Sequence, residues 1–75
     1  MGSERFRGVV TAWDEEQGVG AVRLADGRVV WALFAAIDAP DGAFRELVLG
    51  EEVTLTVSEV AHGDYSWQAD WIRRG

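Results

Sequence analysis

Short apolar runs alternate with polar turn residues along the whole chain. The runs at 6–13, 19–24 and 29–34 are rich in β-branched and aromatic residues, which is typical of β-strands. Between the second and third runs, Asp26-Gly27 is a strong hairpin signal, because this pair tolerates the positive φ of a type I′ turn. The pattern predicts that the first three strands form a meander.

The second half of the chain continues this pattern after one interruption. Residues 35–38 are too few for a full helix and are stopped by Pro40, so we expect one helical or 3₁₀ turn there. A loop over 41–50 follows. The fourth strand, 52–58, alternates strictly between apolar and polar residues. Another loop separates it from a last strand over 65–72.

Five short strands in so small a domain predict a closed barrel. Closure removes the exposed edges of the sheet and builds a core from one side of every strand. We therefore expect an all-β fold, a small five-stranded antiparallel barrel with one short helical turn after the third strand. An open two-layer sandwich is the alternative. The predicted core residues are Val10, Val22, Leu24, Val30, Ala32, Val53, Leu55, Val57 and Ile72.

Length and composition exclude several classes of protein. The 75 residues predict a single domain with its core between about 6 and 72, and the 48% of hydrophobic residues is too high for a disordered chain. Without cysteine, disulfides and thiolate metal sites are excluded, and His62 stands alone, so we expect no metal and no cofactor. A chain this short leaves little room for an internal active site, so we expect no enzymatic activity.

Features of export and of membrane insertion are missing from the sequence. Residues 1–5 lack the basic-then-apolar profile of a signal peptide, and no apolar run approaches the ~20 residues that span a membrane. We expect a cytoplasmic protein. Its seven basic residues are all arginine, and thirteen acidic residues give a net charge of −6. Any nucleic-acid binding must therefore depend on a local patch and on stacking.

The spacing of the first strands carries a family resemblance. Residues 8–22 follow the spacing of G-x-V-K-W-F-N-x-x-K-G-F-G-F-I, with which cold-shock proteins open. The turn at 26–27, the segment 30–37 and the segments 42–47 and 49–53 match later parts of the same pattern, with one residue inserted at Ala43. Over residues 6–72 the chain resembles a cold-shock domain. The resemblance implies an OB-fold barrel that binds single-stranded RNA or DNA on its first three strands.

The departures from that family lie at its binding positions. The motif K-G-F-G-F reads Gln-Gly-Val-Gly-Ala at 17–21, Thr11 and Ala12 replace a lysine and a tryptophan, and Leu33 replaces a histidine. Losing three stacking side chains removes about 3–9 kcal/mol of gross interaction, so we expect weak binding. The resemblance then implies these binding residues: Trp13, Trp31, Phe34 and Phe44 for stacking, and Arg7, Arg23 and Arg28 for phosphates.

Each aromatic residue also has a structural interpretation. Trp31 is either exposed or partly buried under the long loop, and Trp13 either packs at the rim or binds a ligand. Phe34 precedes the helical turn, which favours core packing, and Phe44 either caps the barrel or covers bound bases. Trp67 and Trp71 are expected on one face of the last strand, where they close the barrel end or form a second docking surface.

A second hypothesis replaces nucleic acid by a protein. Alternation puts Val19, Ala21, Trp31 and Leu33 on the outer surface as an apolar patch, which suits a protein partner or a weak dimer of an otherwise monomeric chain. Both hypotheses require the odd-numbered side chains of 19–23 and 31–33 to face outward.

Overall fold

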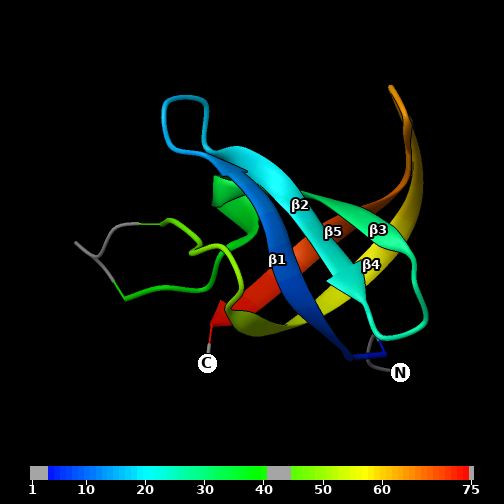
Figure 1. Ribbon diagram of the computed structural model, residues 1–75, viewed down its shortest axis with the longest axis horizontal. Coiled ribbons are helices and arrows are strands. Elements are labelled where there is room, and N and C mark those ends of the chain that lie inside the picture. The colour runs from blue at the N-terminus through cyan, green and yellow to red at the C-terminus, as the bar shows by residue number, and fades with distance from the viewer. Residues whose placement is uncertain (1–3, 41–44, 75) are drawn as a thin grey trace.

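The computed structural model describes residues 4–40 and 45–74, and these form five strands and one 3₁₀ turn. The elements are β1 (Phe6–Asp14), β2 (Val19–Leu24), β3 (Val29–Leu33), η1 (Phe34–Ala36), β4 (Glu52–His62) and β5 (Tyr65–Arg74). The strands close into a barrel in the order β1-β2-β3-β5-β4, and Figure 1 shows the β1–β2 turn at its upper left and the β4–β5 turn at its upper right. The predicted all-β, OB-like barrel is confirmed.

Two details of the strands differ from the prediction. The sequence predicted antiparallel pairing throughout, but β3 and β5 run parallel where Trp31 meets Gln68, because β5 returns from the far end of the long β4. Strand β4 continues to His62, beyond the predicted end at residue 58. Gly63, with φ +59, then lies in the turn that leads directly into β5. The 3₁₀ turn begins at Phe34, which the sequence placed in the third strand.

The interior is filled by the side chains of alternate residues along each strand. Eight of the nine predicted core residues are buried, and the ninth, Val57, is half-buried and packs against them. Ile37, Leu47 and Ala69 complete the core. Ile37 follows η1 and forms an isolated bridge with Ile72, so the turn after β3 closes one end of the barrel.

A β-bulge at Thr11 changes which side chains of β1 face inward. Val10 pairs with Val22, but Ala12 pairs with Ala21, so Thr11 has no partner on β2. Beyond the bulge, Trp13 turns to the core side and packs against the core cluster. Trp13 therefore packs at the rim of the core, which is one of the two interpretations that the sequence allowed.

A second bulge, at Asp70, separates the two tryptophans of β5. Thr56 pairs with Trp71 and Val57 with Ala69, which leaves Asp70 unpaired. Trp67 packs against the core, whereas Trp71, next to the buried Ile72, faces outward. The expectation that Trp67 and Trp71 share one face is wrong, because the extra residue shifts the alternation by one.

Gly20 permits the close approach of β1 and β2 next to the first bulge. A Cβ added at this position would collide with the carbonyl oxygen of Ala12, and it would lie 2.8 Å from Cε3 of Trp13. We expect Gly20→Ala to lower the free energy of unfolding by about 1–3 kcal/mol, because a backbone atom cannot yield as a flexible side chain does. Urea denaturation measures it, with the exposed Ser66→Ala as control. An unchanged midpoint for Gly20→Ala would contradict the packing described here.

Candidate functional site

The outer surface of β2 and β3 has the alternation of inward and outward side chains that the sequence predicted. Val30 and Ala32 are fully buried in the barrel, whereas Trp31 and Leu33 are half-buried on the other side of β3. On β2, Arg23 is exposed between the buried Val22 and Leu24. The required outward orientation of these side chains is confirmed.

Ala21 is the exception on this surface. It is buried but lies outside the core cluster, and its carbonyl oxygen accepts a hydrogen bond from Oγ1 of Thr11 at 3.4 Å. The bulged Thr11 thus contacts the position where the sequence predicted an apolar surface residue. Of the proposed apolar patch, Val19, Trp31 and Leu33 remain partly exposed, and Ala21 does not.

Cross-strand pairing places outward residues of four strands in one row. Val29 pairs with Arg23, Arg23 with Val9, and Val9 with Glu52, across β3, β2, β1 and β4. Val29 and Val9 are 43% and 39% exposed, so an exposed apolar side chain lies on each neighbouring strand opposite Arg23. In the neighbouring row, Trp31 pairs with Ala21 on β2 and with Gln68 on β5.

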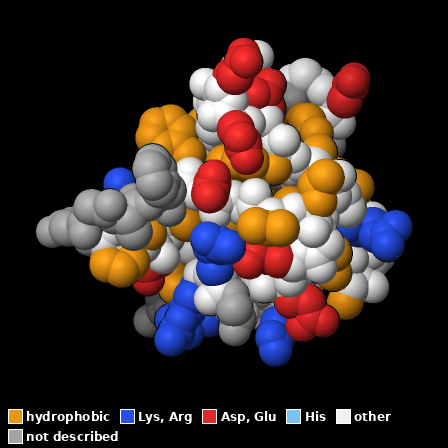
Figure 2. All heavy atoms as spheres, turned by 60° about the vertical axis from the view of Figure 1, so that its left-hand side comes forward, with side chains coloured by type: hydrophobic (Ala, Val, Ile, Leu, Met, Phe, Trp, Pro, Cys, Tyr) orange, Lys and Arg blue, Asp and Glu red, His pale blue; other side chains and the backbone are white. Residues whose placement is uncertain are grey.

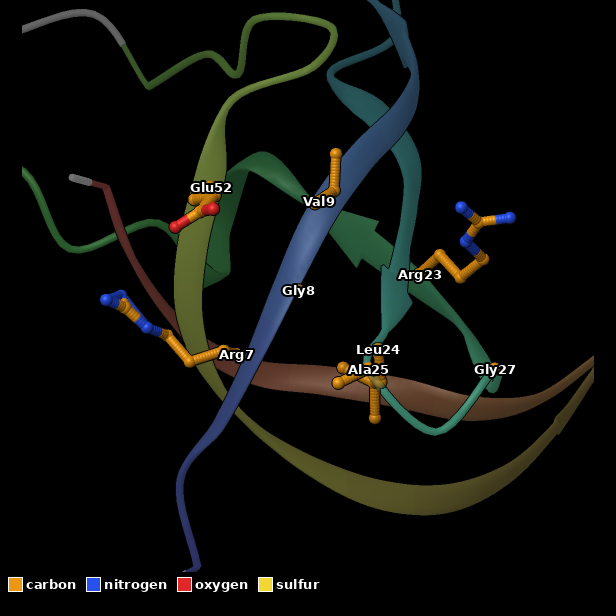
Figure 3. Close-up of a pocket in the computed structure, with 8 residues that line it drawn as sticks. All are labelled: Arg7, Gly8, Val9, Arg23, Leu24, Ala25, Gly27 and Glu52. Atoms are coloured by element: carbon orange, nitrogen blue, oxygen red, sulfur yellow. The ribbon is translucent and has the colours of Figure 1, made fainter.

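A groove of about 560 Å³ follows this row on the outside of β1 and β2. Figure 3 shows Arg7 and Arg23 extending to opposite sides of β1, with Val9 between them. Within the described part of the chain, neither arginine has a carboxylate within ion-pair distance. We call this hollow the β1–β2 groove; it is lined by Arg7, Gly8, Val9, Arg23, Leu24, Ala25, Gly27 and Glu52.

Trp13 and Phe34 lie at the other end of β1, away from Arg7. They share a smaller hollow of about 240 Å³ with Arg45 and with three carboxylates, those of Glu15, Glu16 and Glu46. Carboxylates repel phosphate, so this end is poorly suited to a nucleic-acid backbone. In Figure 2 several acidic side chains gather at the top of the molecule, and arginines lie lower down with a few more carboxylates among them.

Phe34 is 46% exposed, so the expectation that it packs in the core is wrong. Its N–H donates to the carbonyl oxygen of Gly18 at 2.7 Å, and its ring lies against Gly18, which has φ +68. This bond holds the first residue of the 3₁₀ turn against Gly18. Trp13 is half-buried, and within the described residues its buried Nε1 has no hydrogen-bond partner.

Arg28 contacts two aromatic rings and a carboxylate, and it does not line the β1–β2 groove. Its guanidinium lies 4.8 Å from the ring centre of Phe6 and 4.6 Å from that of Trp67, so it is sandwiched between rings of the first and last strands. Nε of Arg28 also donates to Asp26 at 2.8 Å. The backbone N–H of Arg28, with its guanidinium, holds the pKa of the Asp26 carboxyl below its usual range.

The structure therefore divides the predicted site residues into separate groups. Arg7 and Arg23 flank the β1–β2 groove, with Trp31 one row away, whereas Trp13 and Phe34 lie at the acidic end. Phe44 and the inserted Ala43 are outside the described residues. Sequence reasoning missed Val9 and Glu52, which line the groove, and Val29, which pairs with Arg23 beside it. Val9 was detectable, since it alternates with the predicted core residue Val10.

Other kinds of site find no support in the described part of the chain. Residues 4–40 and 45–74 contain no group of three or more His, Asp or Glu side chains that could hold a metal ion, and the side chain of His62 is outside the description. No helix among the same residues is long or apolar enough to cross a membrane.

Comparison with known proteins adds no family to this description. No protein-family model matches the chain, and no curated protein matches it.

The position of Arg28 predicts a structural role for this side chain. We expect Arg28→Gln to lower the free energy of unfolding by about 1–3 kcal/mol, because both ring contacts are lost. Arg23→Gln removes the same charge from an exposed side chain and is expected to change stability by less than about 0.5 kcal/mol. Chemical denaturation of the two variants measures the difference. Equal stability would contradict the sandwich contact.

Proposed function

We propose that this barrel binds single-stranded RNA or DNA weakly on the outer surface of β1–β3, as the resemblance to cold-shock proteins implies. One observation carries the proposal: Arg7 and Arg23 flank an open groove, and no described carboxylate pairs with either of them. Guanidinium groups donate several hydrogen bonds in a fixed geometry that suits phosphate oxygens. Two such groups on either side of one strand suit neighbouring phosphates of one chain.

Apolar and aromatic surfaces beside the arginines support the same function. Val9 and Val29 offer exposed surface for sugars and bases, and the half-buried Trp31 exposes part of its side chain one row away. Base–aromatic stacking is tolerant of sequence, because every base has a π-face. We therefore propose little preference among bases.

The same surface explains why the proposed binding is weak. One tryptophan supplies about 1–3 kcal/mol of stacking. Glu52 lines the groove with both arginines, and the whole chain carries a net charge of −6. Binding should therefore depend strongly on salt, with dissociation constants between about 1 µM and 1 mM.

Titration with oligothymidine and oligouridine at low salt tests the proposal. We expect quenching of tryptophan fluorescence and amide shift changes concentrated on β1–β3. Arg23→Gln should weaken binding about two- to fivefold, and Glu52→Gln should strengthen it by a similar factor, because each changes one charge at the groove. Arg45→Gln, which removes the same charge at the acidic end, is the matched control and should change binding less.

A lack of any response to the oligonucleotides would contradict the proposal. If neither oligonucleotide changes the fluorescence or the amide shifts at millimolar concentration, the proposal fails. Sedimentation of the chain and of a Trp31→Ala variant across a dilution series would then show whether the chain dimerises and whether the apolar patch is needed for it.

A further inference from the structure

Two more arginines, Arg5 and Arg73, lie near Arg7 on the outer surface that β1, β4 and β5 form, around the barrel from β2 and β3. Arg7 pairs with Thr54 on β4, and Thr54 pairs with Arg73 on β5, so both arginines stand in one outward row. With adjacent strands about 4.8 Å apart, the two Cα atoms are about 10 Å from each other. Arg5, two residues before Arg7, places its guanidinium 4.9 Å from the ring centre of Trp71.

The side chains between these arginines carry no charge. Thr54 is half-buried and Thr56 is buried, and these two occupy the outward positions of β4 opposite Arg73 and Trp71. Among the described residues the ion pairs involve only Arg28 and Arg74, so Arg7 and Arg73 have no carboxylate partner. Both are exposed.

Among the described residues, three carboxylates border this area. Glu52 precedes Thr54 on β4, the bulged Asp70 accepts a hydrogen bond from Oγ of Ser58 at 3.0 Å, and Glu4 precedes Arg5 in the chain. The centre of the area is therefore positive on a protein that is acidic as a whole.

Arg7 connects this area to the β1–β2 groove. Figure 3 shows its side chain extending over β4, on the side of β1 opposite to Arg23. Arg7 and Arg73 share one outward row, and Arg23 lies in the next row, opposite Val9. The three arginines therefore form a diagonal across β2, β1, β4 and β5, with Arg5 beside its far end. We call these four residues the arginine band. Several separated cations suit a nucleic-acid strand, whose charges are regularly spaced, better than they suit a single small anion.

Arg5 can contact a phosphate while its guanidinium stays over the Trp71 ring. A guanidinium has five N–H donors, and its contact with a ring face leaves N–H groups that can still donate to an anion. The contact with Trp71 holds the side chain against β5, so less conformational entropy is lost when a phosphate binds.

We propose that a bound single strand does not end at the β1–β2 groove but crosses β1 and continues over β4 and β5, with Arg7, Arg73 and Arg5 contacting its phosphates. This inference rests on the proposed function and extends its site to a second face of the barrel. It commits to single-stranded nucleic acid, because the band is continuous with the proposed groove.

Oligothymidines of two lengths test the path of the strand. Sites on OB folds cover about 4–16 nucleotides, so about four nucleotides can fill the groove and about twelve can also reach β5. We expect the longer oligonucleotide to shift the indole Nε1–H resonance of Trp71, and the shorter one to leave it unchanged. Arg73→Gln and Arg5→Gln should each weaken the longer one several-fold and reduce its slope of log K against log salt by about 0.7. Arg45→Gln removes the same charge at the acidic end and should leave the slope nearly unchanged.

The outcomes separate this inference from the proposed function. If the longer oligonucleotide shifts β1–β3 but not Trp71, and Arg73→Gln leaves its salt slope unchanged, the extended path is wrong and the groove remains a binding site. If neither length binds, both proposals fail. If oligoglutamate shifts Trp71 and the longer oligothymidine does not, the area belongs to acidic protein segments, and the extended path is again overturned.

Discussion

A closed barrel must fill its interior from one side of every strand, and this requirement determines everything on the outside. Val10, Val22, Val30, Val53 and Leu55 are buried almost completely, so their chain neighbours are forced outward. Moving any strand by one residue would exchange the two sets and bury polar or charged side chains. The positions of the outward arginines therefore follow from aliphatic packing, although no arginine takes part in it.

The sequence predicts the fold and most of the core because alternation and turn chemistry are local signals. It fails where an inserted residue shifts the alternation. The bulges at Thr11 and Asp70 turned Trp13 inward and Trp71 outward, and alternation with constant register cannot show either change. Gly20 was a partial signal, since glycine in a strand often marks close approach of two backbones.

The candidate site was less predictable than the core, because its contacts join residues that are distant in sequence. Arg28 looked like a phosphate ligand, but Phe6 and Trp67 hold it from the two ends of the chain. Conversely, Arg73 and Arg5 come near Arg7 only through the pairing of β4 with β1 and β5 and the contact of Arg5 with Trp71. A net charge of −6 conceals this distribution, since it sums charges that lie on different faces.

The sandwich of Arg28 also bears on the folding of the barrel. Its two rings belong to the first and last strands, so it forms only after nearly the whole polypeptide has come together. The entropy of bringing such distant parts of the chain together must be overcome before the contact can stabilise the barrel. The contact therefore ties the first strand to the last, and separating these two strands requires breaking it.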